Sequence, residues 1–377
     1  MAIEINPFIV AGRIPEPYFC DRVAESKRLI RCIMNQENVV LISPRRVGKT
    51  EIVNHCFDNE KIAEHLITIS IDILHTTSFS EFVMELGSAV YNRIARRSDK
   101  LFKLFVASMK TLHGSFGYDP INNTPTFAIK LGDIIQPDYS IEEIFNYIEQ
   151  ADKRCVIMID EFQQITKYAN ENVEAILRSH IQKSSNANFI FAGSQRRIMN
   201  EMFLANNRPF YQSSTLIPLA PITLDVYTDF VIRHFNKADK NITQEAIEKV
   251  YHTFDGITFY IQRIMHDAFA ETPSKGIVDV SVTDALTERF LLESSTRLRE
   301  QLAYVTEQQK ELLYAICEEG SAGHITSGSF IRQHHLKSAS AVQSAIKRLL
   351  EYDLVTENER QYSIADPLLR IWIKHNL

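Results

Sequence analysis

The residues best suited to phosphate chemistry lie in one short segment, SPRRVGKT, which runs from Ser43 to Thr50. The segment matches the phosphate-loop pattern G-x-x-x-x-G-K-[ST] except that serine replaces the first glycine. In such a loop, successive N–H groups and the following helix N-terminus point at one place and favour an anion. Gly48 allows the backbone to approach closely, Lys49 reaches the β- and γ-phosphates, and the Thr50 hydroxyl is a ligand for Mg²⁺.

Serine at position 43 is a tolerable departure from the pattern. The side chain is small, and the loop keeps its curvature if the φ of Ser43 stays negative. The alternative is a basic helix start that contains G-K-T by chance. The predicted nucleotide-binding residues are Ser43, Pro44, Arg45, Arg46, Val47, Gly48, Lys49, Thr50 and Glu51.

A second acidic motif follows an apolar run at Cys155 to Ile159, where Asp160 and Glu161 come directly after the expected strand. Ligands of open α/β sheets bind at the carboxyl ends of strands, so both carboxylates are expected to face the phosphate loop. Asp160 is placed to hold Mg²⁺ together with Thr50, and Glu161 to act as the base toward a water. A solvated acidic pair explains this motif taken alone, but the two motifs together, in this order, favour phosphoryl transfer.

The elements that must position these residues follow an alternating pattern. Short apolar segments at 39–42, 65–73, 187–194 and 215–222 are typical of strands, as is 155–159. Helical stretches such as 79–94 and 172–183 separate them. This alternation predicts a parallel α/β sheet.

Four segments together resemble a known family. NPFIVAGRIPEPYFCDRVAESKRL, SPRRVGKT, VIMIDEF and FIFAGSQRRIM, in this order, look like the ATPases of the AAA+/STAND group, often described as archaeal-type ATPases. The resemblance implies an α/β, additional-strand P-loop domain with a catalytic glutamate, then a helical lid and a C-terminal winged helix. It also implies that ATP is the nucleotide, since no guanine-reading motif is present.

The resemblance assigns further site residues. Arg22, in the F-x-x-R box that begins at Phe19, is expected near the adenine. Ser194 and Gln195 resemble a polar sensor of the γ-phosphate, although a polar turn is an equally good interpretation. The resemblance also offers Arg208 as a catalytic arginine acting in cis or across a subunit interface, and Arg263 as a second sensor. A surface arginine is at least as good an interpretation of position 208.

Three domains are predicted: a P-loop core at 1–222, a helical lid at 223–300 and a winged helix at 301–377. In the winged helix, Thr306 and Gln309 form a capping box, and a helix of apolar spacing follows near 338–351. The residues that would read DNA from that helix are Ser340, Gln343, Ser344 and Lys347. From 301 onward, eight Lys/Arg stand against nine Asp/Glu, a net charge of −1, so a protein partner is favoured over DNA.

The segment between the second and third core strands reads as an insertion. A basic amphipathic helix is predicted at 93–110. Its interpretations are a packed helix with a solvated basic face, which is favoured, a surface that contacts nucleic acid or a membrane, or a contact surface for a protein partner. A hairpin strand is predicted at 124–132, and Ser140 with Glu143 is predicted to form a capping box that opens the next helix.

Composition sets the remaining bounds. The chain has 377 residues with a formal net charge of −6, which argues against non-specific coating of nucleic acid. Five scattered cysteines without a C-x-x-C pair indicate neither a zinc site nor a disulfide framework. No apolar run approaches the roughly 18 residues of a membrane span. We expect a soluble, unprocessed cytoplasmic protein without a membrane partner, and leave self-association open.

These observations predict a Mg²⁺-dependent ATPase of slow turnover, in which γ-phosphate occupancy moves the lid and the winged helix. The alternative is a winged-helix regulator of DNA or of a protein, for which ATP is a bound ligand with little turnover. The acidic pair favours the enzyme, because a pure binding switch needs no base beside Asp160.

Overall fold

A computed structural model describes residues 5–111, 115–119, 124–169 and 172–376, and these residues form two compact units. One unit holds residues 22–220 and contains the phosphate loop. The other combines residues 1–21 with residues 221–377. The predicted core began at residue 1, whereas the contacts group the first 21 residues with residues 221–377.

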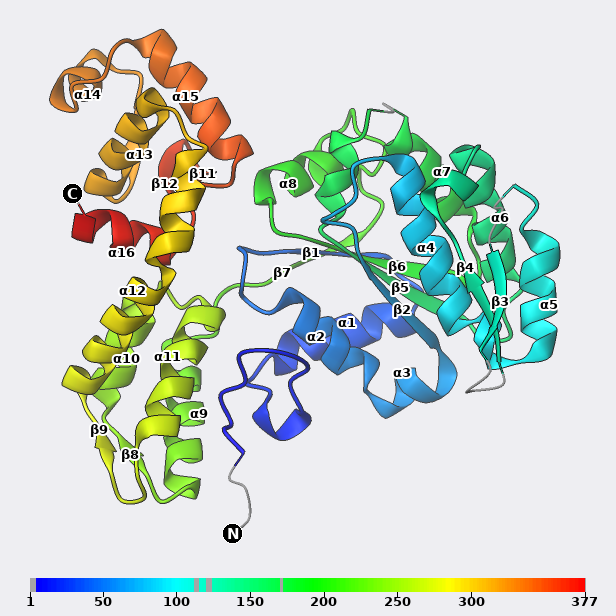
Figure 1. The fold of residues 1–377 in the computed structure, drawn as a ribbon, viewed down its shortest axis with the longest axis horizontal. Helices are drawn as coiled ribbons and strands as arrows, with labels where there is room; N and C mark the ends of the chain where they lie inside the picture. Colours follow the sequence, from blue (N-terminus) through cyan, green and yellow to red (C-terminus); the bar gives the residue numbers. More distant parts are fainter. Residues whose placement is uncertain (1–4, 112–114, 120–123, 170–171, 377) are drawn as a thin grey trace. The chain divides into compact units, whose positions relative to one another are not determined.

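The unit at 22–220 is built on a five-stranded parallel sheet (Figure 1). Its order is β2-β5-β6-β1-β7, so β6 lies between the strand before the phosphate loop and the strand before the acidic pair. The strands are β1 (Val39–Ile42), β2 (Ile67–Asp72), β5 (Cys155–Asp160), β6 (Ala187–Gly193) and β7 (Thr215–Pro218). Registers Ile42 to Gly193 and Asp72 to Asp160 align the carboxyl ends of these strands at one edge.

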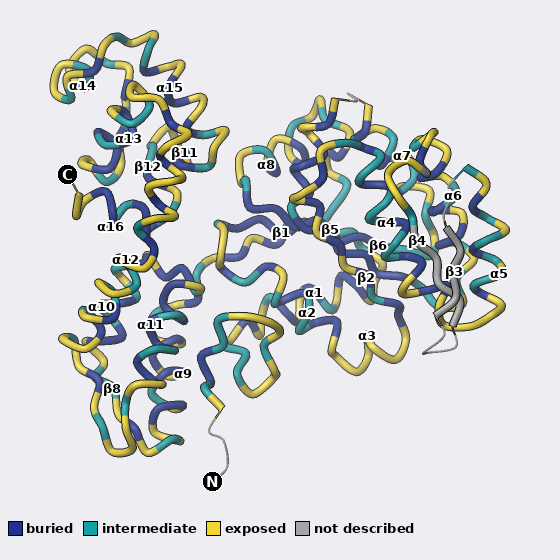
Figure 2. The backbone as a smooth tube through the Cα atoms, in the orientation of Figure 1, coloured by how far each residue is buried: buried dark blue, intermediate teal, exposed yellow. Residues whose placement is uncertain are grey.

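Helices cover both faces of this sheet, and its inner strands β1, β5 and β6 are buried almost throughout. The edge strand β2 instead alternates between buried and more exposed residues. All six residues of β5 are buried, and alternate residues Cys155, Ile157 and Ile159 join one core with the helices α4 and α6 (Figure 2). Burial on both faces removes the period-two pattern of a half-exposed strand. The helical segments here are α1 (Val23–Met34), α2 (Lys49–Phe57), α3 (Glu60–His65), α4 (Phe79–Arg93), α5 (Asp99–Ser108), α6 (Pro137–Glu149), η4 (Phe162–Lys167), α7 (Val173–Lys183) and α8 (Arg196–Leu204).

Two local predictions in the insertion are wrong. The basic helix predicted at 93–110 is interrupted, because α4 ends at Arg93, a 3-10 turn follows (Ala95–Arg97), and extended Ser98 caps the N-terminus of α5 with its hydroxyl. Ser140 does not cap a helix either. Pro137 fixes the first turn of α6 three residues earlier, and the hydroxyl of Ser140 instead contacts Thr111 inside the fold.

The hairpin of the insertion pairs β3 (Ser115–Asp119) with β4 (Thr124–Ala128) in antiparallel register. The strand predicted at 124–132 therefore exists but ends at residue 128. Part of the insertion lies outside the described residues. The basic side chains of Arg93, Arg96 and Lys100 are exposed while Leu101 and Phe105 are buried, which is the pattern of a packed helix with a solvated face.

The second unit is helical in its first half. The N-terminal segment packs there through Phe8, which is fully buried with its ring 5.6–5.9 Å from the rings of Phe230, Phe235 and Phe269. Asn6 adds a hydrogen bond to the carbonyl of His266. The elements are η1 (Glu16–Tyr18), α9 (Leu224–Lys237), β8 (Asn241–Ile242), α10 (Gln244–Thr253), α11 (Thr258–Glu271), β9 (Ile277–Val278) and α12 (Val280–Ala303).

The second half of this unit has four described helices, α13 to α16, and a three-stranded sheet of order β10-β12-β11. The predicted capping box of Thr306 and Gln309 is confirmed, and β11 and β12 form an antiparallel pair. Trp372 is buried and its Nε1 donates to Ser295 in α12. The elements are α13 (Glu307–Glu319), β10 (Ala322–Gly323), α14 (Gly328–Gln333), α15 (Ala339–Glu351), β11 (Val355–Asn358), β12 (Gln361–Ile364) and α16 (Pro367–Asn376).

Candidate nucleotide-binding site

The phosphate loop links β1 to α2 at the carboxyl end of the sheet. Gly48 has a φ of 92° and Arg46 a φ of 66°, so two residues of the loop have a left-handed backbone conformation before α2 begins at Lys49. The φ of Ser43 is not positive, so serine is accommodated without backbone strain. The sequence departs from the strict glycine pattern only where the backbone does not need glycine.

Lys49 is held inward although it carries a charge. Lys49 is only 7% exposed, and its Nζ donates to the Ser43 hydroxyl and to the carbonyl of Pro44, each at 3.3 Å. The Ser43 hydroxyl donates in turn to the carbonyl of Pro44 at 2.9 Å. The residue that departs from the pattern thus contacts the lysine of the same loop.

Thr50 and Asp160 meet although 110 residues separate them. The Thr50 hydroxyl donates to Oδ2 of Asp160 at 2.6 Å, and the backbone N–H of Glu161 donates to Oδ1 at 2.9 Å. Burial raises the pKa of Asp160, the hydrogen bond from Thr50 lowers it, and the neighbouring Glu161 carboxylate raises it again, with a net increase. A buried carboxylate of this kind favours a cation beside it.

The donor set at Thr50 and Asp160 fits Mg²⁺. A hydroxyl oxygen and a carboxylate oxygen lie in hydrogen-bond contact, and both atoms are hard oxygen ligands. Mg²⁺ commonly takes one or two carboxylates and keeps waters or phosphate oxygens as its other ligands. In the described part of the chain no group of three or more His, Cys, Asp or Glu side chains could hold a metal by itself. The site therefore suits a metal that arrives with a phosphate.

Glu161 lies at the centre of a hydrogen-bond network at the end of β5. It has a left-handed backbone, with a φ of 55°, at the turn into η4. Its Oε2 accepts from the Ser194 hydroxyl at 2.7 Å and from the amide of Gln163 at 2.5 Å. The Ser194 oxygen also accepts from Nε of Arg45 at 3.2 Å, so this network links the phosphate loop to the acidic pair.

Gln163 is a buried polar residue of this network that the sequence did not single out. It is 1% exposed and contacts the carboxylate of Glu161. The available signal was its place two residues after Glu161, in the run Asp-Glu-Phe-Gln. Glu161 precedes η4 and Gln163 lies in its first turn. Side chains two residues apart do not face each other on a regular helix, so this spacing alone does not predict the contact.

Arg22 reaches the phosphate loop from the start of α1. It is 5% exposed, and its guanidinium donates to the carbonyl of Val47 at 3.3 Å and to Glu25 at 3.0 Å. The structure therefore joins the N-terminal box to the loop backbone. Contact of Arg22 with a base stays a prediction.

The remaining arginines have carboxylate partners of their own. Arg208 pairs with Glu174 of α7 and, at 3.0 Å, with Glu201 of α8. Arg263 donates to Asp267 at 3.2 Å within α11. The structure thus pairs each predicted phosphate contact with carboxylates, and both roles stay predictions. Gln195 caps the start of α8 by its backbone position, directly after Ser194.

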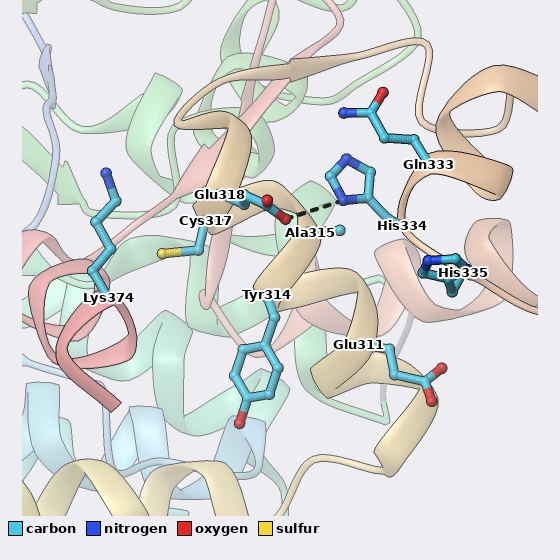
Figure 3. A pocket seen from close by; sticks show the side chains of 9 residues that line it. All are labelled: Glu311, Tyr314, Ala315, Cys317, Glu318, Gln333, His334, His335 and Lys374. Atoms are coloured by element: carbon cyan, nitrogen blue, oxygen red, sulfur yellow. Dashed lines mark ion pairs between the residues drawn. The ribbon is translucent and has the colours of Figure 1, made fainter. Parts of the chain in front are cut away.

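A separate pocket lies in the winged-helix region, where α13, α14 and α16 meet. Figure 3 shows His334 pointing toward Glu318, with a separation of 3.4 Å between Nδ1 and the carboxylate. Cys317 and Lys374 line the same pocket. It contains none of the predicted nucleotide-binding residues.

The helix proposed to read DNA is α15, and its four predicted contact residues are exposed. They are Ser340, Gln343, Ser344 and Lys347, while Val342, Ala345, Ile346 and Leu349 are buried against the domain. No helix in the described part of the chain has the length and apolar character that a membrane crossing requires.

Comparison with known families gives two matches. Residues 19–264 match the model of an ATPase domain predominantly from Archaea, and this match covers more than half of the chain. Residues 296–375 match a probable winged helix domain. An uncharacterized HTH-type transcriptional regulator of Methanocaldococcus jannaschii is 22% identical over 382 aligned residues, which cover 93% of this chain and 87% of that protein.

Solved structures show the same fold over the whole chain. A Walker-type ATPase of Pyrococcus abyssi aligns with a TM-score of 0.68 and 16% identity, over 98% of this chain and 99% of that chain. The ORC2 protein of Aeropyrum pernix, in complexes with ADPNP and ADP, aligns with a TM-score of 0.60 and 12% identity, over 99% and 97%. The ORC1 protein of Aeropyrum pernix, in complex with DNA, aligns with a TM-score of 0.51 and 12% identity, over 95% of this chain and 93% of that chain. The predicted parallel-sheet P-loop ATPase fold with a C-terminal winged helix is confirmed.

Proposed function

Because the chain belongs to the family of ATPase domains found predominantly in Archaea, we propose that it binds ATP with Mg²⁺ and hydrolyses the γ-phosphate slowly. The observation that carries the proposal is the hydrogen bond from Thr50 to Asp160, with Glu161 directly beside it. This contact brings the two separate sequence motifs into one site. A phosphate loop alone supports binding, and the adjacent carboxylate adds a base for water.

Each residue of the proposed nucleotide site has a role that follows from its chemistry. The N–H groups of the loop and the start of α2 receive phosphate oxygens. Lys49 is buried with its ammonium group turned to the loop, where a phosphate oxygen can replace the carbonyl of Pro44 as its partner. Thr50 and Asp160 would hold Mg²⁺, which when bound neutralises charge on the β- and γ-phosphates.

Glu161 would complete the reaction as general base. The oxygen of a water bonds to the γ-phosphorus while the bond from that phosphorus to the bridging oxygen of ADP breaks. Glu161 takes the proton that the water releases and later returns it to solvent. Ser194, which contacts both Glu161 and Arg45, would sense the γ-phosphate between them.

We also propose that nucleotide state moves the lid and the winged helix, and that a protein partner reads the movement. Two observations favour a second candidate function, a DNA regulator that binds ATP with little turnover. The readers proposed on α15 are exposed, and the M. jannaschii relative is described as a transcriptional regulator. The near-neutral charge of the winged helix and the presence of Glu161 favour the enzyme.

The test is ATP binding and turnover of the full chain with Mg²⁺, for the wild type, Lys49→Ala and Lys61→Ala. Lys61 is an exposed lysine of α3 and serves as the matched control. We expect the wild type to hydrolyse ATP, Lys61→Ala to match it, and Lys49→Ala to lose roughly a hundredfold in turnover with weakened binding. Wild-type affinity for ATP in Lys49→Ala would contradict the assignment of the phosphate loop.

A further inference from the structure

We propose that Gln163 is a positioning residue, which anchors one oxygen of the Glu161 carboxylate so that the other oxygen can act as the base. The inference rests on the proposed ATP hydrolysis and extends it to a residue outside the phosphate loop and the acidic pair. The observation behind it is that both donors to Glu161 contact the same oxygen, Oε2.

The two donors fix the carboxylate from two directions. The amide of Gln163 donates at 2.5 Å from η4, and the hydroxyl of Ser194 donates at 2.7 Å from the end of β6. Within the described residues no donor contacts Oε1 of Glu161, so this oxygen keeps its lone pairs for the proton of a water. Two hydrogen bonds on one oxygen define the direction in which the other one points.

The two donors differ in what else they contact. Ser194 also accepts from Arg45 of the phosphate loop, so its bond to Glu161 is open to exchange when phosphate arrives. Gln163 is 1% exposed, and its polar contact is with Glu161 through Nε2. An exchange at Ser194 therefore leaves the amide of Gln163 as the fixed contact of the base.

The surroundings hold this amide in place. A Cβ at Gly193 would lie 2.5 Å from Oε1 of Gln163, so the amide lies directly over that glycine. The orientation of the amide follows from charge, since Oε1 in place of Nε2 would set its lone pairs against a carboxylate. The position of Gln163 thus depends on a glycine at the end of β6.

The burial of Gln163 has a cost that packing does not explain. Its Oε1 is buried without a hydrogen-bond partner among the described residues. An unsatisfied buried amide oxygen destabilises a fold, and methionine would fill the same space without that cost. Such a cost is expected where the polar group acts on a functional neighbour. The next residue, Gln164, is different, because its Nε2 donates to the carbonyl of Thr76 at 2.8 Å and its role is structural.

The experiment compares Gln163→Met with the control Gln164→Met in the full chain, by measuring Mg²⁺–ATP affinity and single-turnover hydrolysis. We expect Gln163→Met to keep its affinity within about twofold and to lose roughly tenfold to a hundredfold in turnover. Its melting temperature should stay near that of the wild type, because the loss of the hydrogen bond to Glu161 is offset by removal of the unsatisfied amide oxygen. Gln164→Met should keep its turnover within about twofold at temperatures where it is folded.

A double variant separates positioning from general damage. In the Glu161→Gln background, Gln163→Met should cause no further loss in the residual rate, because its effect passes through the carboxylate. Three results would overturn this inference and leave the proposed hydrolysis standing. They are an equal loss of turnover from Gln163→Met in both backgrounds, equal losses of turnover in Gln163→Met and Gln164→Met, and unchanged turnover in Gln163→Met. A wild type that binds ATP without hydrolysing it would overturn the proposed hydrolysis and this inference with it.

Discussion

Gly193 shows how the absence of a side chain shapes the site. It ends β6 in register with Ile42 of β1, and a Cβ there would meet Oε1 of Gln163 and Sδ of Met199, each at 2.5 Å. Its backbone is ordinary for a strand, so glycine is present for space and not for its φ. Space of this kind depends on tertiary packing and leaves no mark in the sequence.

The variant Gly193→Ala should therefore lose both stability and activity. We expect a loss of about 1–3 kcal/mol in the free energy of unfolding, since overpacking forces neighbours aside. Turnover should fall because Gln163 must shift away from Glu161. Urea unfolding and ATP turnover measure the two effects. The control is Gly132→Ala, where an added Cβ meets nothing within 4 Å and the expected change stays within about 0.5 kcal/mol. Equal behaviour of the two variants would contradict this account.

The same scale shows what the sequence could and could not predict at the site. Lys49, Thr50, Asp160 and Glu161 were predicted from fixed spacings after apolar strands, and the structure brings Thr50 and Asp160 into contact. The carboxylate partners of Arg208 were not predictable. They lie 34 and 7 residues away along the chain, and only the tertiary fold brings Glu174 of α7 and Glu201 of α8 to the arginine.

At the scale of elements, one carboxylate ties the end of α6 to the turn before β6. Glu149, the last residue of α6, accepts from the hydroxyl and N–H of Ser185 and from the N–H of Asn186. The Ser184 hydroxyl also donates to it, at 2.5 Å. Burial raises the pKa of Glu149, but the hydrogen bonds from Ser184 and Ser185 outweigh it and lower the pKa overall.

The contribution of these Glu149 hydrogen bonds to the free energy of unfolding should decrease as the pH falls. The pKa of Glu149 is lower in the folded state, so its contribution is present above the unfolded pKa and is lost as pH falls through the folded pKa. We expect Glu149→Gln to lower the free energy of unfolding by about 1–2 kcal/mol at pH 7, and by less below about pH 4. Urea unfolding at both pH values measures it. The exposed Glu142 of the same helix gives the control Glu142→Gln. A loss that does not change with pH would contradict the assignment.

Helices and strands were predicted well where the apolar periodicity was strong. They were predicted poorly where a capping side chain had to be identified to place the start of a helix. The strands of the sheet and the helices around them follow from apolar runs. The start of α6 was misplaced because Ser140 and Glu143 fit a capping box in spacing, yet Pro137 begins the helix and both side chains bind Thr111. A spacing rule cannot tell a cap from a tertiary contact made with the same atoms.

At the scale of the whole molecule, a P-loop ATPase fold followed by a C-terminal winged helix was predicted from the sequence. The grouping of the first 21 residues with residues 221–377 was not predicted. Phe8 lies in an apolar run too short to show its partners, which are aromatic residues more than two hundred positions later. Long-range packing of this kind needs the fold to be known. The helix α12 likewise continues to Ala303, through the expected end of the lid at 300.

The proposed role of Glu161 as the base of an ATPase is tested most directly by the variant Glu161→Gln. Glutamine keeps the shape of the side chain and cannot take a proton from water. We predict that Glu161→Gln binds Mg²⁺–ATP as the wild type does while its turnover falls by roughly a hundredfold to ten-thousandfold. Equal turnover in the two proteins, or a wild type that binds ATP without hydrolysing it, would contradict the claim and leave ligand-gated binding as the function.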